Sequence, residues 1–204
     1  MQTTTFPHVP HDSSSARYAL FRDVENAPAL RQRIVKASTM QGKKGELEKE
    51  AVNFAFIDAR LITSRKHLTT AIHQAILADS ANPSGLKTKS VHSEVLFNLN
   101  PTNNITEALR NYGLSDTSTD LVVVRIGSPD VPDNVIQELM KDVVIGNIVE
   151  PFETELEQLT DWGLVKRYFK LNTEPALKDL EGQAEREAVD KIVTSSVAMK
   201  SVVQ

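Results

Sequence analysis

The stretch FAFIDARLITSRKHLTTAIHQAI, residues 54–76, decides the fold class because it joins a short strand to a helix. Residues 54–57 are apolar without strict alternation, which predicts a strand that is buried on both faces. Thr63 or Ser64 can cap the helix that follows. The apolar residues of that helix recur three and four positions apart and form one predicted buried face: Leu68, Ala71, Ile72, Ala75 and Ile76.

Upstream of this stretch, the sequence predicts a strand over 16–22 and a helix over 26–39. Asn26 can cap that helix, and Pro28 suits its first turn, where a backbone donor has no helical partner anyway. The polar, glycine-containing residues 40–53 follow as a surface insertion whose second half can be helical.

Downstream, alternation and turn signals predict the remaining elements. Residues 91–99 alternate between two sets of side chains, which is typical of a half-buried strand. Asn104 can cap a short helix, with Glu107 placed as in a capping box and Gly113 as its C′ residue. The other elements are a loop at 79–90, a buried strand at 120–127, a helix over 131–146 and acidic helices near 150–160, 161–170 and 176–199. The sequence thus predicts an α+β fold: a small, mostly antiparallel or mixed β-sheet packed with helices, and a helical C-terminal part.

The composition indicates one globular domain, residues 16–200, after a flexible N-terminal tail, residues 1–15. The chain has 204 residues, of which 40% are hydrophobic and 25% charged, and it has no cysteine. Disulfides, thiolate nucleophiles and cysteine-based zinc sites are therefore excluded. The apolar runs are too short for a bilayer, and the tail lacks the features of a secretory signal, so we expect an intracellular protein without membrane contact. His8 and His11 are expected to be disordered with the tail.

The net charge of −4 is unevenly distributed along the chain. Five basic residues and one acid lie between Ala59 and His92, whereas eleven acids and five basic residues lie between Glu150 and Asp190. This asymmetry fits two different partners, and it equally fits two solvated faces.

Four polar residues of the opening stretch are the candidates for chemistry. Asp58 follows a buried strand and could be a general base, although an aspartate that caps a turn is commoner. His67 and His73 are six residues apart and point about 120° from each other, so they are not expected to share a metal ion. Lys66 and His67 lie in the first helical turn, where free backbone N–H groups favour a phosphate. No catalytic set, metal site or cofactor is predicted, so a binding role is favoured over an enzyme.

Three segments together resemble one known family: FAFIDARLITSRKHLTTAIHQAI at 54–76, SEVLFNLNPTNNITEALRNYGLSD at 93–116 and DLVVVRI at 120–126. Their order and spacing are similar to those of the kinase-binding subunit of the KEOPS (EKC) complex, the family of the animal PRPK-binding proteins (TPRKB). The resemblance is greatest to fungal members and covers about Ala16 to Val197.

The resemblance implies a non-catalytic accessory subunit that binds and stimulates a small kinase-like ATPase. It also implies that the subunit helps recruit tRNA, in archaeal members through the 3′ CCA end, for threonylcarbamoyl-adenosine modification next to the anticodon. The chemistry would belong to another subunit, a metal-containing transferase that this chain would meet only indirectly. A nuclear and cytoplasmic location is implied, and the fungal complex is linked to telomere maintenance.

The same resemblance assigns candidate residues to two partners. Lys66 and His67 match a basic–histidine pair at the helix start, and Asn98 stands in a segment where archaeal members can place a basic residue. The candidates for tRNA binding are Arg65, Lys66, His67, Lys87, Lys89, Asn103, Asn104 and Arg110. The candidates for kinase binding lie on the C-terminal helix and are Val189, Ile192, Val193 and Ser196; the alternative is that the apolar ones close this protein's own core.

Two other functions are consistent with the sequence. One is a protein-interaction module that regulates a small kinase without RNA contact, which the net charge of −4 favours. The other is a small α+β hydrolase that uses Asp58 and His67.

Overall fold

Within residues 1–81 and 85–202, which the computed structural model describes, an antiparallel sheet of five strands lies at the centre. Residues 82–84, part of the loop predicted at 79–90, lie outside the described residues. The strands are β1 (Gln2–Thr5), β2 (Ser15–Arg22), β3 (Ala55–Asp58), β4 (Leu121–Gly127) and β5 (Asn147–Val149).

The helices are α1 (Ala27–Thr39), α2 (Gly42–Ala51), α3 (Arg65–Ser80), α4 (Val91–Leu99), α5 (Ile105–Tyr112), α6 (Asp133–Val143), α7 (Phe152–Leu159), α8 (Trp162–Tyr168) and α9 (Gly182–Met199). Short 3-10 helices lie at His11–Ser13, Ala59–Leu61, Leu171–Thr173 and Pro175–Leu177. The predicted α+β class, with a helical C-terminal part, is confirmed.

The sheet order is β1-β2-β4-β3, and β2 is its central strand. β4 pairs with β2 from Ser15 to Phe21, and β3 pairs with the far side of β4. β1 and β5 pair with successive parts of β2 and therefore share its remaining edge. The prediction of a flexible tail over 1–15 is wrong for residues 2–5, because the backbone of this segment completes the open edge of β2.

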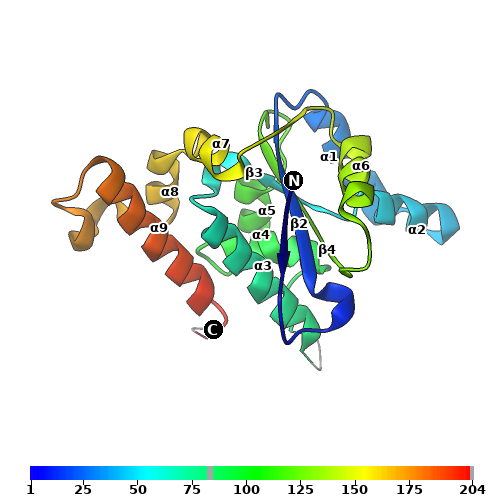
Figure 1. Ribbon diagram of the computed structural model, residues 1–204, viewed down its shortest axis with the longest axis horizontal. Coiled ribbons are helices and arrows are strands. Elements are labelled where there is room, and N and C mark those ends of the chain that lie inside the picture. The colour runs from blue at the N-terminus through cyan, green and yellow to red at the C-terminus, as the bar shows by residue number, and fades with distance from the viewer. Residues whose placement is uncertain (82–84, 203–204) are drawn as a thin grey trace.

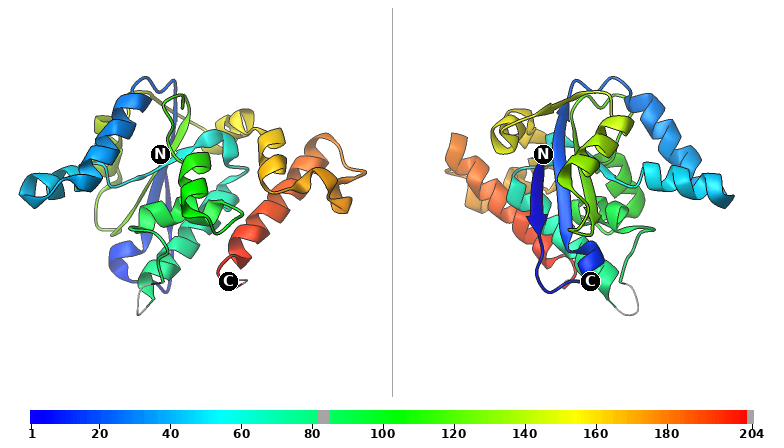
Figure 2. Two further views of the ribbon diagram at one scale, coloured as in Figure 1. Left: turned by 180° about the vertical axis from the view of Figure 1, so that it is seen from behind. Right: turned by 45° about the vertical axis from the view of Figure 1, so that its right-hand side comes forward.

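The strands β2, β3 and β4 are buried on both faces, and their alternate side chains enter two separate cores. Tyr18 and Leu20 of β2 face the core under α3, α4 and α9, whereas Ala19 and Phe21 face the core under α1 and α6. Figure 1 and Figure 2 show these two helical layers on opposite sides of the sheet. The sequence predicts a buried strand near 54–57 because apolar residues there do not alternate with polar ones, and the structure confirms this strand as β3.

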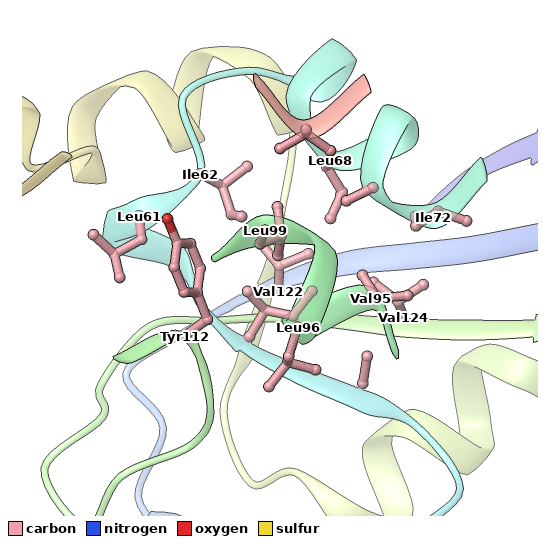
Figure 3. Packing of buried hydrophobic residues seen from close by; sticks show 14 of the residues in the cluster. Leu61, Ile62, Leu68, Ile72, Val95, Leu96, Leu99, Tyr112, Val122 and Val124 are labelled. Carbon is pink, nitrogen blue, oxygen red and sulfur yellow. The ribbon is translucent and has the colours of Figure 1, made fainter. Parts of the chain in front are cut away.

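The prediction of a strand over 91–99 is wrong, because these residues form α4. Ser90 and Ser93 close a capping box, in which each side chain accepts a hydrogen bond from the other residue's backbone N–H. Figure 3 shows how the α4 side chains pack between α3 and the sheet, among Leu68, Ile72, Val95, Leu96, Leu99, Val122 and Val124. Polar and apolar positions of α4 are buried alike, so the alternation in the sequence did not mark an exposed face.

The remaining predicted elements are largely confirmed, with shifted ends. Ser64 rather than Thr63 caps α3, and Asn104 caps α5 as expected. Asn26 precedes α1, but its side chain bonds to Val143 and Ile145 instead of capping the helix. The sequence predicts helices from about residue 150 onward and no strand after Gly146, so it misses β5 (147–149), which pairs with the free edge of β2.

Candidate partner-binding surfaces

Asp58, the candidate general base, caps a turn. Its Oδ1 accepts a hydrogen bond from the backbone N–H of Arg60 at 3.0 Å, and its Oδ2 pairs with the Arg60 guanidinium at 2.7 Å. The carboxylate is thereby committed to its own loop. This geometry gives the hydrolase hypothesis no support.

His67 is completely buried, with 0% of the residue exposed. Its Nδ1 accepts a hydrogen bond from the backbone N–H of Thr63 at 3.3 Å. Burial lowers the pKa of His67 to about 4, and the nearby Asp190 carboxylate opposes this shift only in part. The imidazole is neutral at physiological pH and inaccessible, which contradicts the prediction that His67 contacts a phosphate.

The two basic residues beside His67 differ in availability. Arg65 donates from Nε to the Tyr18 hydroxyl at 2.7 Å and pairs with Glu153 at 3.2 Å. Lys66 is exposed and forms no ion pair with any residue that the structure describes. The first turn of α3 therefore presents Lys66 as its free cation.

The basic residues between Arg60 and Lys89 are close in the sequence, but they do not form one patch on the surface. α3 has 16 residues and is about 24 Å long, so Lys66 lies at one end of it and Lys87 and Lys89 follow the other end. Lys87 and Lys89 are exposed. The sequence places these residues in one segment, but the helix between them separates their charges.

The remaining tRNA candidates lie around α4 and α5. Asn103 and Asn104 are exposed, and Asn104 uses its side chain to cap α5 through the Glu107 N–H. Arg110 is exposed at the other end of α5. Asn98 is buried and donates to the Ala71 carbonyl at 3.4 Å, so it belongs to the core rather than to a surface turn.

A groove of about 1120 Å³ opens between α1 and α5, with α4 and β3 at its base. Its apolar lining includes Ile34, Val35, Val52, Phe54, Phe56, Leu96, Leu109 and Leu114. Four cationic side chains also line it: Arg31, Lys49, Lys89 and Arg110. We call this the α1–α5 groove. Lys89 and Arg110 were tRNA candidates, whereas Arg31 and Lys49 were missed because nothing in the sequence brings α1 and α2 next to α5.

The predicted kinase-binding residues of α9 lie on two different faces. Val189 and Val193 are 1% and 0% exposed and belong to the core shared with α3, so the alternative assignment of these two to the protein's own core is confirmed. Ile192 is half-buried and Ser196 is exposed. Met199 continues that exposed stripe at position i+7 from Ile192 and is 51% exposed, a helical spacing that could have identified it from the sequence.

Polar contacts fix α9 at its middle and just beyond its C-terminal end. The Thr63 hydroxyl donates a hydrogen bond to Oδ1 of Asp190 at 2.6 Å. Just beyond the helix, the Lys200 ammonium donates to the carbonyls of Phe97, Asn100 and Thr102 at the C-terminal end of α4. Burial lowers the pKa of Lys200 to about 8, and the Glu94 carboxylate opposes this shift. The exposed stripe of α9 is therefore carried on a fixed helix.

Among the described residues, no group of three or more His, Cys, Asp or Glu side chains could hold a metal ion. Within the same residues, no helix is long and apolar enough to cross a membrane. What the structure presents is two surfaces suited to macromolecules: the stripe on α9 and the α1–α5 groove.

Comparisons with known proteins agree with one another. Residues 21–201 match the model of a protein family described as "Kinase binding protein CGI-121". The chain is 34% identical to the EKC/KEOPS complex subunit CGI121 of Cryptococcus neoformans var. neoformans, with 100% of each chain covered. The subunit of that name from Neurospora crassa is 33% identical with 99% of each chain covered. The one from Aspergillus fumigatus is 34% identical with 85% of each chain covered.

Proposed function

Because this chain belongs to the kinase-binding protein CGI-121 family, we propose that it is an accessory subunit of an EKC/KEOPS complex. In this role it binds and stimulates the kinase-like ATPase subunit and helps recruit tRNA, through the 3′ CCA end, for threonylcarbamoyl-adenosine modification. The family membership carries the kinase half of the proposal, and it agrees with the resemblance found in the sequence.

The exposed stripe on α9, formed by Ile192, Ser196 and Met199, is the surface that we assign to the kinase-like subunit. These positions lie within one helical face, roughly a quarter turn around the helix from the buried Val193, and the inner part of Ile192 packs against the protein's own core. A half-buried isoleucine and an exposed methionine on a fixed helix suit an interface in which apolar anchors enter a partner.

The kinase half can be tested by co-elution of the full chain with the cognate kinase-like subunit on a sizing column. We expect the wild type to co-elute and Ile192→Asp to fail, because an unpaired charge buried in an apolar interface costs several kcal/mol, on the order of the affinity of a modest complex. The ATPase rate of the kinase-like subunit should rise with the wild type and not with the variant.

Leu47→Asp is the matched control, since Leu47 is 72% exposed on α2, at the opposite end of the molecule from α9 (Figure 1). Thermal melts of both variants establish that they remain folded. Co-elution of a folded Ile192→Asp variant would move the kinase contact away from this stripe. Absence of wild-type binding would remove the kinase role itself.

Lys66 is the residue on which the tRNA half rests most directly. It is exposed in the first turn of α3 and has no ion-pair partner among the residues that the structure describes, and the backbone N–H groups there also favour an anion. Lys87 offers a second exposed cation beyond the other end of α3, at a separation that a tRNA backbone can span. The overall charge of −4 means that any such contact has to come from local clusters.

Binding of tRNA to the full chain at several salt concentrations tests this half. Lys66→Glu with Lys87→Glu should weaken binding and reduce the slope of log K against log salt by about one for each lost phosphate contact. Lys43→Glu is the control, because Lys43 is exposed on α2 away from α3. A tRNA trimmed of its 3′ CCA should bind more weakly than the intact one.

Unchanged affinity in the double variant would refute the assignment to α3. If the chain bound no tRNA at any salt concentration and still bound the kinase-like subunit, the chain would instead be a regulatory interaction module without RNA contact. The net charge of −4 favours that second function.

A further inference from the structure

The α1–α5 groove is not used by the proposed kinase contact. None of its lining residues belongs to α9, and α1 and α2 lie at the opposite end of the molecule from α9 (Figure 1, Figure 2). Val35 on the α1 wall is 60% exposed, and Leu109 on the α5 wall is 45% exposed. Two exposed aliphatic side chains thus flank a hollow of about 1120 Å³.

The charge around this groove is positive, in contrast to the whole chain. Asp116 is the only acidic residue among its lining residues, and it pairs with Arg31 at 3.2 Å. Lys49, Lys89 and Arg110 have no ion-pair partner within the described part of the chain. Three uncompensated cations around an apolar hollow call for a ligand that carries both apolar groups and negative charge.

An RNA strand fits this lining less well than a protein segment does. Unstacked bases are held by exposed aromatic faces, but the phenyl rings of Phe54 and Phe56 lie in residues that are only 6% and 5% exposed. The accessible walls are aliphatic instead. Aliphatic walls suit the leucine or phenylalanine anchors of a peptide.

The sheet edge beside the groove is partly blocked, which favours a helical ligand over an added β-strand. β3 is the edge strand next to the groove, and an incoming strand would need its free backbone groups. Ile57 in β3 already forms an antiparallel bridge with Gly113. That bridge blocks part of the edge, whereas a helix lying between α1 and α5 needs no backbone pairing.

We propose that the α1–α5 groove binds an acidic amphipathic α-helix of a protein partner. Apolar side chains at helical spacing enter between Val35 and Leu109, and carboxylates on the flanks of the helix face Lys49, Lys89 and Arg110. The groove gives the chain a second protein contact, independent of the one proposed on α9.

The test is a selection of displayed peptides of about 16 residues, roughly four helical turns, against the full chain, followed by fluorescence anisotropy of the enriched peptides. The Leu109→Asp variant is kept out of the selection and is used only in the binding measurements. We expect enriched peptides with apolar residues three and four positions apart and with a net negative charge. Their affinity should fall at least about tenfold for Leu109→Asp and for Lys89→Glu, and stay unchanged for Leu47→Asp and Lys43→Glu.

All four substitutions replace exposed side chains, and thermal melts establish that the variants are folded. Enriched peptides that are basic, or that bind the Leu109→Asp variant as tightly as the wild type, would overturn the proposal. A short single-stranded RNA of mixed sequence is measured in parallel. RNA binding that is lost in Lys89→Glu and Leu109→Asp, without any peptide binding, would assign the groove to RNA and overturn the proposal in that way.

Discussion

Two buried histidines should make the fold acid-sensitive well above the range in which most carboxylates titrate. Burial lowers the pKa of His67 to about 4, and burial together with the Arg125 charge lowers that of His92 to about 3. His92 accepts a hydrogen bond through Nε2 from the Ile126 N–H at 3.0 Å, so it is needed in its neutral form. In the unfolded chain both imidazoles titrate near pH 6.5.

The direction in which stability changes with pH follows from how many protons the folded and the unfolded chain bind. Below about pH 6.5 the unfolded chain binds a proton at each imidazole and the folded chain does not, so the free energy of unfolding falls as the pH falls. Between about pH 6.5 and pH 5 the loss amounts to roughly 1.5 kcal/mol for each histidine, or roughly 3 kcal/mol for the two. The loss continues until the pH approaches the folded-state values.

Urea unfolding followed by the fluorescence of the one tryptophan, Trp162, measures this loss. His67→Asn and His92→Gln each place an amide oxygen near the lost nitrogen acceptor but cannot be protonated. Each variant should lose about half of the wild-type pH dependence in this window. His11, whose pKa the Asp130 carboxylate raises, is exposed and remains in every variant, so it cancels in the comparison. The same pH dependence in the wild type and the double variant would refute the burial argument for both residues.

Three further predictions concern stability, measured by urea or thermal unfolding. Val193→Ala should lower the free energy of unfolding by about 2 kcal/mol because Val193 is fully buried, whereas Ser196→Ala should change it by no more than about 0.5 kcal/mol. Equal losses in the two variants would contradict the assignment of these residues to a buried and an exposed face of α9. Lys200→Met should cost about 2 kcal/mol, since three carbonyls lose a charged donor, and an unchanged melt would mean that these bonds add nothing. Glu94→Ala should cost a similar amount and speed amide exchange at Thr88, whose N–H and hydroxyl both donate to the Glu94 carboxylate; unchanged exchange would argue against this contact.

Much of the fold could be read from local signals. Helix caps such as Ser64 and Asn104 act within a few residues, so their sequence pattern and their structural role coincide. The buried strands β3 and β4 follow from continuous apolar runs. The strand predicted at 91–99 failed because alternation indicates a strand only when one face is solvated, and α4 is covered on nearly every side.

The candidate sites were less predictable, since a site depends on which residues share a surface. The basic residues from Arg60 to Lys89 looked like one patch in the sequence, but α3 carries Lys66 away from Lys87 and Lys89. Lys89 instead lies with Lys49 and Arg110 in a groove built from four stretches of the chain, 31–38, 49–56, 89–96 and 109–117. No pattern of local spacing in the sequence encodes which distant segments form one groove.

The sequence by itself determined the family, the α+β class, the absence of cysteine chemistry and most helix and strand positions, because these depend on composition, local hydrogen bonding and hydrophobic period. Only the tertiary structure decided that His67 and Val193 are core residues and that residues 2–5 complete the sheet. The walls of the α1–α5 groove, too, come together only in the tertiary structure. The physical reason is that burial is set by what packs against a residue, and those neighbours come from distant parts of the chain.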